Sequence, residues 1–368
     1  MIKHFFGRII AAVLFVSLWA CSAAKPEPGA EQLIIASWNV QNLFDGLDNG
    51  FEYDEFKNSE GWNEEKYRAR LNSITGAMKG DGGFNPDILA LIEVENSGVV
   101  RDLAEAMGFL YTFFAGFPES SMGMGILSKL PLTGTRVHSY HSSDGSIPRP
   151  VAEVWAETQS GPLALLVCHW KSKLGGEKNT EALRRAGAAL VVRRLLEIDA
   201  ERPGTPVIIM GDLNENHNEF DRIEGTYRCA LFPDTSEAAM LAGNNRINLR
   251  PGFQDFLVLS NQKPPRAYFF SGTGPVPEIS GLVYSPWMER EENSPGSFFY
   301  KDTWETIDHF LLNAALFGNQ GWEYKHFLVL AEPPFANGEG RPRTYNPKTG
   351  NGLSDHFPII LVLNKTPQ

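Results

Sequence analysis

Short hydrophobic runs alternate with polar, turn-forming segments along most of the chain. Seven of these runs have the length of a β-strand, are rich in β-branched or large apolar residues, and are bounded by turn formers. They are residues 33–40, 87–94, 124–129, 163–170, 206–214, 307–312 and 357–363. The pattern predicts that each run forms a buried strand.

Two segments between these runs have the periodicity of a helix. The apolar positions of the first are Tyr67, Leu71, Ile74 and Met78, and those of the second are Leu183, Ala186, Leu190, Leu195 and Ile198. Asn63 is a suitable N-cap for the first helix and Gly80 follows its last apolar position, while Pro203 ends the second. Strands interleaved with helices predict a layered α/β or α+β domain, and long loops between the strands favour two packed sheets over one Rossmann sheet.

The N-terminal residues have the pattern of an export signal. Lys3 and Arg8 form a positive n-region before an apolar stretch at residues 9–20, which is too short for a comfortable membrane span. The following "SLWAC" and its Pro/Gly-rich polar tether resemble a bacterial lipoprotein signal, in which cleavage leaves Cys21 as a lipidated N-terminus. We therefore expect a signal at 1–21, a flexible tether at 22–32 and a single domain at 33–368, exported to the cell envelope and anchored to a membrane. The alternative is an ordinary secretory signal, which would give a secreted or periplasmic soluble protein.

Composition excludes some classes of function. The 368 residues are 42% hydrophobic, enough for a large core, and 33 Lys and Arg stand against 44 Asp and Glu, for a formal net charge of −11. A chain this acidic is not a basic clamp that binds nucleic acid by charge alone. Cys168 and Cys229 could pair in an oxidising compartment, but their spacing does not match a zinc motif.

Most of the predicted strands end in polar residues that a hydrophobic core would not select. These residues are Asn39, Glu93, His169, Asp212 with Asn214, Asp308, and Asp355 with His356. Each one alone has a simple explanation as a turn, cap or surface residue. Because buried acids and amides are unfavourable when unpaired, and because layered folds build sites at strand ends, their repetition predicts that they converge on one another and on a cation.

The order of these motifs resembles the endonuclease/exonuclease/phosphatase superfamily, which includes pancreatic-type deoxyribonucleases, apurinic endonucleases, neutral sphingomyelinases and inositol polyphosphate phosphatases. The segments that carry the resemblance are "SWNVQNLF", "LALIEVEN", "CHWKSK", "IIMGDLNE", "TIDHFLL" and "LSDHFPI". The resemblance implies an α/β fold, a four-layered α/β sandwich in which two packed mixed β-sheets are flanked by helices, with the site at one rim.

The resemblance also implies a metal site. Glu93 matches the acid that coordinates an essential divalent cation, Asn39 matches the amide beside it, and Asp355 matches a further acid near the metal. Mg²⁺ is the expected ion, with Mn²⁺ or Ca²⁺ as alternatives, because hard cations take oxygen ligands. Strand alternation places Glu95 on the same side as Glu93, as a weaker candidate.

Five residues match the catalytic positions of that family. Asp212 and Asn214 correspond to the pair that positions water and phosphate, and His169 to a residue that hydrogen-bonds phosphate. Asp308 corresponds to the acid that orients the final histidine, His356. A histidine beside a carboxylate is also a base tuned near neutral pH. Whether His356 or Asp212 takes the proton of the water stays open.

Basic residues near these motifs are candidates for binding phosphate. Arg149 is suited to a forked contact, and Lys171 follows His169 closely. Lys173, Arg184 and Arg185 could line the entrance or be ordinary surface charges.

The expected function is metal-dependent hydrolysis of a phosphodiester, first of all by a non-specific extracytoplasmic endonuclease. The alternatives are a sphingomyelinase-like or small-molecule phosphoesterase, for which the aromatic segment 284–304 would contact an interface, and a lipid-anchored binding protein without catalysis. The expected partners are nucleic acid or another phosphodiester and a membrane, and no protein partner is evident.

Overall fold

Apolar side chains alternate between the two faces of each central strand, and this alternation sorts them into separate layers of core. In β1 (Gln32–Leu43), Trp38 and Val40 pack against helices, whereas Leu33 and Ile35 face a second sheet. The computed structural model describes residues 31–80, 84–116, 121–139, 149–236, 238, 254–266, 281–318 and 320–366. All of these belong to one compact unit, Glu31–Gln368.

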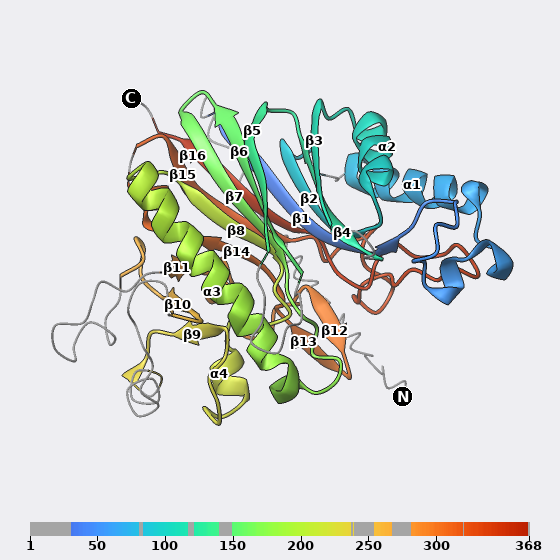
Figure 1. Cartoon of the computed structure of the whole chain (residues 1–368). Helices are drawn as coiled ribbons and strands as arrows, with labels where there is room; N and C mark the ends of the chain where they lie inside the picture. Colours follow the sequence, from blue (N-terminus) through green and yellow to red (C-terminus); the bar gives the residue numbers. More distant parts are fainter. Residues whose placement is uncertain are drawn as a thin grey trace, which may run out of the picture. The chain divides into compact units, whose positions relative to one another are not determined.

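Two large sheets form the centre of this unit (Figure 1). Among the described residues, the first has six strands in the order β15-β16-β1-β2-β4-β3 and the second has eight in the order β5-β6-β7-β8-β14-β11-β10-β9. The first sheet consists of β1, β2 (Ile88–Val94), β3 (Tyr111–Ala115), β4 (Gly123–Ser128), β15 (Trp322–Val329) and β16 (Ile359–Lys365). The second consists of β5 (Leu132–His138), β6 (Val151–Thr158), β7 (Gly161–His169), β8 (Val207–Asp212), β9 (Leu231–Pro233), β10 (Leu257–Ser260), β11 (Leu282–Tyr284) and β14 (Asp308–Leu312). Both sheets are mixed, because β1–β2 and β7–β8 are parallel while β1–β16 and β8–β14 are antiparallel.

Helices cover the outer faces of both sheets (Figure 1). On the first sheet, α1 (Glu64–Lys79) and α2 (Ser97–Met107) bury Tyr67, Ile74 and Leu103. On the second sheet, α3 (Glu177–Glu201) buries Leu190 and Ile198. The remaining elements are short: α4 (Glu219–Arg222), the hairpin β12 (Phe298–Tyr300) and β13 (Thr303–Glu305), and 3₁₀ turns at Asp54–Phe56, Asn58–Glu60, Pro286–Glu289 and Ala314–Phe317. The predicted four-layered α/β sandwich is therefore confirmed.

The predicted elements are found where the hydrophobic pattern placed them. All seven apolar runs contain strands, and both helical segments are helices. The Asn63 side chain accepts a hydrogen bond from the Lys66 amide at 3.1 Å, as expected of an N-cap, and Gly80 follows the last helical residue. Sequence periodicity did not predict α2, and the strands β3, β5, β6, β9, β10, β11, β12, β13 and β15 lie outside the seven runs.

The described residues do not test the prediction that the protein is exported. Residues 1–30 lie outside them, so the signal segment and most of the tether are not described. None of the helices in the described part of the chain combines the length and apolar character needed to cross a membrane. Cys168 and Cys229 are buried free thiols.

A buried ion-pair group ties α3 to the second sheet. Glu153 on β6 is fully buried and accepts hydrogen bonds from Arg194 at 2.8 and 3.1 Å, from His138 at 2.7 Å and from Trp155 at 2.8 Å. Burial opposes ionisation, but the hydrogen bonds from His138, Arg194 and Trp155 outweigh it and lower the pKa of Glu153 from 4.5 to about 2.

This group predicts a particular acid sensitivity. Because the folded pKa is depressed, its contribution to stability is present above pH 4.5 and is lost as the pH falls towards 2. We expect Glu153→Gln to lower the free energy of unfolding by roughly 3 kcal/mol at neutral pH, with the difference shrinking below pH 4.5. Urea unfolding at a series of pH values measures this, with Glu105→Gln on the exposed face of α2 as the control. A difference that is the same at pH 7 and pH 2.5 would contradict the assignment.

Candidate active site

Strand register brings the predicted site residues to one rim of the two sheets. His169 is the last residue of β7 and pairs in register with Asp212, the last residue of β8. Asp308, the first residue of the antiparallel β14, is also in register with Asp212. On the facing sheet, Asn39 is the last residue of β1 before its register with β2 shifts, and it pairs with Ile92, next to Glu93. Each sheet therefore presents polar side chains at the same edge.

An irregularity in the backbone directs the Glu93 side chain toward this site. The pairing of β1 with β2 shifts register between Asn39 and Leu43, and Glu93 has a left-handed φ of 67° at the irregular position. Its Oε2 accepts from the Asn42 amide at 3.0 Å. The buried Arg70 holds this bend by donating to the carbonyls of Val40, Gln41 and Asn42 and by stacking on Tyr345, 3.6 Å from the ring centroid.

The same bend corrects the prediction for Glu95. Strict alternation does not hold across the irregular position, and Glu95 instead accepts from the Asp45 amide at 2.7 Å and from Asn49 Nδ2 at 2.6 Å. Burial raises the pKa of Glu95 to about 7. Glu95 thus anchors the loop after β1 rather than the polar centre.

Asn39 connects the carboxylates of the two sheets. Its Nδ2 donates to Glu93 Oε1 and to Asp212 Oδ2, both at 3.1 Å. His169 Nε2 lies 3.7 Å from each of the same two carboxylates. A carboxylate oxygen of Glu93, a ring nitrogen of His169 and a carboxylate oxygen of Asp212 lie within 4.8 Å of one another. These residues form the first half of the site.

The second half is a histidine–carboxylate pair. His356 Nδ1 hydrogen-bonds to Asp308 Oδ2 at 2.7 Å, and both side chains are buried. Ser354 fixes the approach of this segment, since its hydroxyl donates to the Asn39 carbonyl at 2.6 Å and accepts from the His356 amide at 3.0 Å. Phe298 stacks on the imidazole with centroids 4.6 Å apart. Ser354 and His356 of the S-D-H motif are therefore each held by specific contacts.

Close packing requires the glycine of the G-D-x-N motif. Gly211 has a φ of 121°, and a Cβ on it would lie 2.1 Å from the Cys168 carbonyl oxygen. Beyond it, Asp212 Oδ1 accepts from the Asn214 amide at 2.9 Å, and Asn214 Nδ2 donates to the Trp170 carbonyl at 3.2 Å. The motif thus links the ends of β7 and β8.

The pKa values of the two site histidines are shifted in opposite directions. Burial lowers the pKa of His169 well below its usual range, and the nearby Arg149, His356 and Lys171 lower it further. Burial also disfavours a charged His356, but Asp308, Asp355 and Asp212 outweigh it and raise the pKa of His356 well above its usual range. Burial thus favours the neutral form of His169, and the surrounding carboxylates favour the charged form of His356.

Asp212 lies between these groups. Burial and repulsion from Asp308 and Glu93 raise the pKa of Asp212 to about 7, although His356 opposes the shift. Its proton equilibrium therefore lies near neutral pH.

The structure divides the predicted basic residues into two groups. Arg149 Nη1 contacts His169 Nε2 and donates to the Trp170 carbonyl at 3.3 Å, so it lies at the site. Lys171 is half-buried, and its pKa is lowered mainly by burial and further by repulsion from Arg149 and Arg184.

Asp355, the further acid predicted near the metal, is only partly exposed, and its Oδ1 lies 3.9 Å from His356 Nε2.

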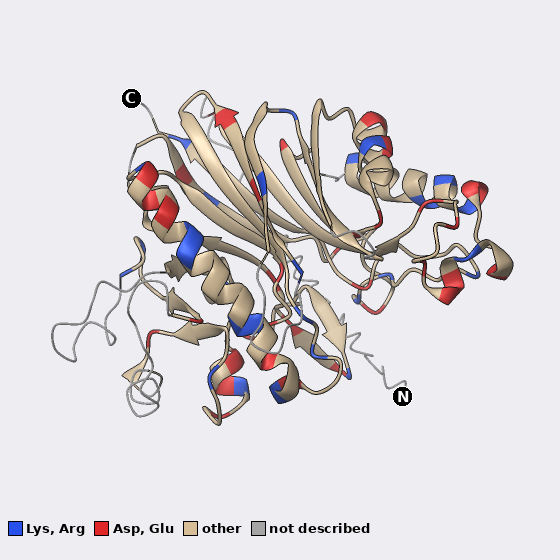
Figure 2. Cartoon of the chain, viewed as in Figure 1, with Lys and Arg blue, Asp and Glu red and all other residues tan. Residues whose placement is uncertain are grey.

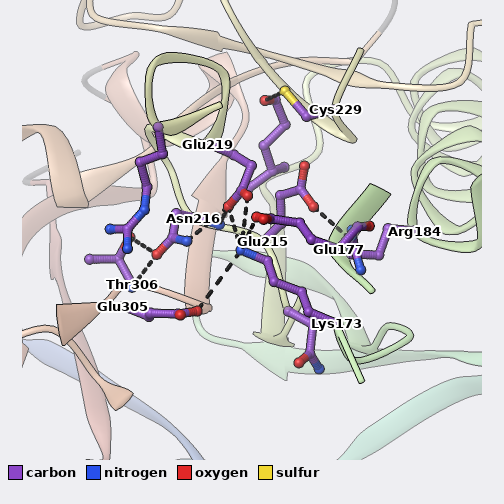
Figure 3. Close-up of polar contacts among 12 residues, drawn as sticks. Lys173, Glu177, Arg184, Glu215, Asn216, Glu219, Cys229, Glu305 and Thr306 are labelled. Atoms are coloured by element: carbon purple, nitrogen blue, oxygen red, sulfur yellow. Dashed lines mark hydrogen bonds and ion pairs between the residues drawn. The ribbon is translucent and has the colours of Figure 1, made fainter. Parts of the chain in front are cut away.

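Lys173 and Arg184 do not line an entrance, which corrects that expectation. Lys173 Nζ lies 2.8 Å from Glu219 and 3.1 Å from Glu177. Arg184 is fully buried and donates to Glu181 and Glu215, each at 2.6 Å. Figure 3 shows this network, which we call the α3 ion-pair network. It supports the loop after β8. Sequence reasoning named its cations but missed its glutamates, because charge alone does not reveal burial.

The comparisons with known proteins agree with this geometry. The model of the endonuclease/exonuclease/phosphatase family matches residues 34–226, more than half of the chain. The chain belongs to this family. It is accordingly a phosphoesterase, as the sequence motifs predicted.

Solved structures of this family share the fold at low sequence identity. A truncated Caenorhabditis elegans TDP2 has a TM-score of 0.52 and 15% identity, covering 90% of this chain and 97% of that one. A D. rerio TDP2 complexed with single strand DNA product has a TM-score of 0.50 and 15% identity, covering 91% and 99%. An endonuclease/exonuclease/phosphatase family protein from Bacteroides thetaiotaomicron has a TM-score of 0.50 and 14% identity, covering 92% and 99%. The comparison with curated proteins gave no match.

The family depends on divalent metal, and the donor set of this chain fits such an ion. Carboxylate oxygens of Glu93 and Asp212 face each other across Asn39, and His169 is a nearby neutral nitrogen. Asp308 Oδ1 is buried and has no hydrogen-bond partner in the described part of the chain, so this centre has unused acceptor capacity. Glu93 is the residue that would hold a hard dication, with the Asp212 carboxylate facing it. When bound, such an ion polarises a phosphoryl oxygen and offsets charge in the transition state.

Proposed function

We propose that this phosphoesterase is a Mg²⁺-dependent endonuclease that acts outside the cytoplasm on nucleic acid without sequence preference. The observation that carries the proposal is the convergence of Glu93, His169, Asp212, Asp308 and His356 at one rim. Acidic and basic side chains occur together along α1 and α3 (Figure 2), so affinity for a polyanion would come from a few positioned groups. A fold neighbour, the D. rerio TDP2, has been solved with a single strand DNA product.

The proposed roles follow from the protonation states. Asp308 holds His356 through Nδ1, which leaves the Nε2–H of the imidazolium to donate to a phosphate oxygen. Asp212 has a pKa near 7 and accepts the proton of the attacking water. Asn214 positions the loop that carries this carboxylate, and Arg149 donates to a nonbridging oxygen. Water then attacks phosphorus in line with the leaving oxygen.

A substrate panel tests the proposal. Supercoiled plasmid DNA, single-stranded RNA, sphingomyelin and a sugar phosphate monoester would each be incubated with the protein in Mg²⁺ and in EDTA. We expect conversion of the plasmid to nicked and linear forms in Mg²⁺ and no conversion in EDTA. Turnover confined to the monoester would sink the nuclease proposal.

A lipid phosphodiester is the second candidate, and one observation favours it. The β12–β13 hairpin stands directly beside His356, and its Tyr300 is 51% exposed. Exposed aromatic side chains next to a phosphoesterase centre suit an interface between lipid and water. Hydrolysis of sphingomyelin but not of plasmid would select this candidate.

Metal dependence provides a prediction for Glu93. Removing its charge deletes one of two carboxylates that face the proposed Mg²⁺ while keeping the Asn42 contact possible. We expect Glu93→Gln to raise the Mg²⁺ concentration for half-maximal activity about tenfold or more, as removal of a metal ligand does. Titration of activity and calorimetric titration of Mg²⁺ both measure this. An unchanged Mg²⁺ dependence would remove Glu93 from the metal site.

The N-terminal pattern supports membrane attachment through a lipidated Cys21. We expect Cys21→Ala to move the expressed protein from the membrane fraction to the soluble fraction of the envelope. Fractionation followed by immunoblotting measures the distribution. Retention of the variant in the membrane fraction would refute the lipid anchor.

A further inference from the structure

The start of the β12–β13 hairpin contacts both members of the histidine–carboxylate pair. The backbone of Phe298 forms an isolated antiparallel bridge with His356. The preceding residue, Ser297, is fully buried; its carbonyl accepts from the Phe357 amide at 2.7 Å, and its hydroxyl accepts from the Asp308 amide at 3.2 Å. This short segment therefore links the strand that carries Asp308 to the segment that carries His356.

Close packing fixes this segment within the hairpin. The Ser297 amide donates to the Glu305 carbonyl at 2.9 Å, and a Cβ added to Gly296 would lie 2.2 Å from the same carbonyl oxygen. Phe298 is in register with Glu305 across the hairpin. Because only glycine allows two backbones to approach so closely, the segment is a fixed support for the groups that it contacts.

The side chain of Phe298 covers a face of the His356 imidazole. The two rings are stacked, with centroids 4.6 Å apart and an interplanar angle of 29°. Phe298 also stacks on Tyr300, with centroids 6.1 Å apart and an angle of 16°, so a row of rings leads from the exposed Tyr300 to the buried imidazole. The face of a phenyl ring carries partial negative charge and attracts a positively charged imidazole, so the contact is favourable.

The hydrogen bond to Asp308 does not by itself fix the plane of the imidazole. It holds one ring atom, Nδ1, 2.7 Å from Asp308 Oδ2, and the ring torsion of a histidine has broad minima. Rotation of the ring about this hydrogen bond would change the direction of the Nε2–H bond, and the Asp355 carboxylate, 3.9 Å from Nε2, would attract it. A stacked ring opposes that rotation, because a tilt would separate the two faces.

We propose that Phe298 is a positioning residue, which fixes the plane of the His356 imidazole so that the Nε2–H bond points at a phosphate oxygen of the substrate. This assignment depends on the proposed role of His356 as the donor to phosphate, and it applies to any phosphoester substrate. Phe298 acts only through His356. Catalytic groups must be held within about 0.5 Å and 10–20° of the productive geometry, so a loosened imidazole lowers turnover more than binding.

Kinetics on a small soluble phosphodiester test this role without depending on the choice between nucleic acid and lipid. The substrate is bis(p-nitrophenyl) phosphate in Mg²⁺. We expect Phe298→Leu to lower kcat about tenfold or more, while KM changes by less than about twofold. Phe298→Tyr keeps the ring and should recover most of the lost turnover. Phe299→Leu removes a ring from the next position of β12, where it packs against Trp304 and Arg341, and should leave kcat unchanged.

A double variant and a crystal structure separate positioning from a general loss of structure. In the His356→Ala background, Phe298→Leu should have no further effect on kcat, because the group that it positions is gone. Crystal structures of the wild-type and Phe298→Leu proteins measure the orientation of the imidazole directly. We expect the His356 ring to be rotated towards Asp355, or to adopt two orientations, in the variant alone.

The outcomes distinguish the positioning role from the proposed role of His356. Equal turnover in Phe298→Leu and Phe299→Leu, or an equal loss with and without His356, would overturn the positioning role and leave the proposed function intact. An unrotated imidazole in the variant would overturn it even if the small substrate is not cleaved. Activity of His356→Ala close to that of the wild type would remove His356 from the chemistry, and the role of Phe298 with it. If thermal unfolding shows that Phe298→Leu is misfolded, Phe298→Met is the second variant without a ring.

Discussion

Replacement of His356 by alanine is expected to lower kcat by about 10³-fold or more, without unfolding the protein. The Asp308 carboxylate holds the imidazolium in place, and general acid–base groups contribute 10²- to 10⁴-fold. The residue lies at the rim of the sheets, so its loss leaves the layers of core intact. Single-turnover cleavage of plasmid DNA measures the effect, with exposed His326→Ala on β15 as the control.

Asp308→Asn provides the companion measurement. The amide cannot stabilise the imidazolium, so we expect a loss of kcat similar to that of His356→Ala. Because the two residues act as one unit, the double variant should be little worse than either single variant. Losses that multiply, or activity within tenfold of wild type for His356→Ala, would remove the pair from the catalytic machinery.

Arg184→Met is expected to lower the free energy of unfolding by about 3–5 kcal/mol. Arg184 is fully buried in the α3 ion-pair network and makes hydrogen bonds of 2.6 Å to both Glu181 and Glu215. Its removal leaves two buried carboxylates without their cation, and it also frees the Lys171 carbonyl that Arg184 contacts at 3.2 Å. Both effects act on the loops that follow β7 and β8.

Urea unfolding checks this prediction, and a matched variant makes it specific. Arg193→Met removes an exposed cation from the same helix and should change stability by less than about 0.5 kcal/mol. Adding Glu215→Gln to Arg184→Met neutralises one stranded carboxylate and should recover part of the loss. If both arginine variants cost the same stability, the buried network does not have the proposed role.

Local pattern predicted the site well because its residues sit at strand ends. Apolar runs fix where β7, β8 and β14 stop, and register then brings His169, Asp212 and Asp308 into one row. The sequence also predicted α1 from its period and caps. The strand ends and the helix caps each depend on a few residues that are neighbours in the sequence.

Features that depend on distant partners were not predictable in this way. Glu95 does not lie in the site because Glu93 adopts a left-handed backbone conformation, which the alternation of side chains along a strand does not predict. Arg184 is buried because of Glu215, a partner 31 residues away. Ser354 reads as an ordinary turn residue until it meets the Asn39 carbonyl, 315 residues away.

The antiparallel pairing of β1 with β16 has a consequence for the order of events during refolding. Gln32 faces Asn364 across this ladder, and a hydrogen bond joins their side chains over a separation of 332 residues. Closing so long a loop is entropically unfavourable and slow, and the imidazole joins the other catalytic groups only when that loop has closed. Recovery of turnover after dilution from denaturant should therefore lag behind recovery of helical circular dichroism, and it would mark the last step of folding.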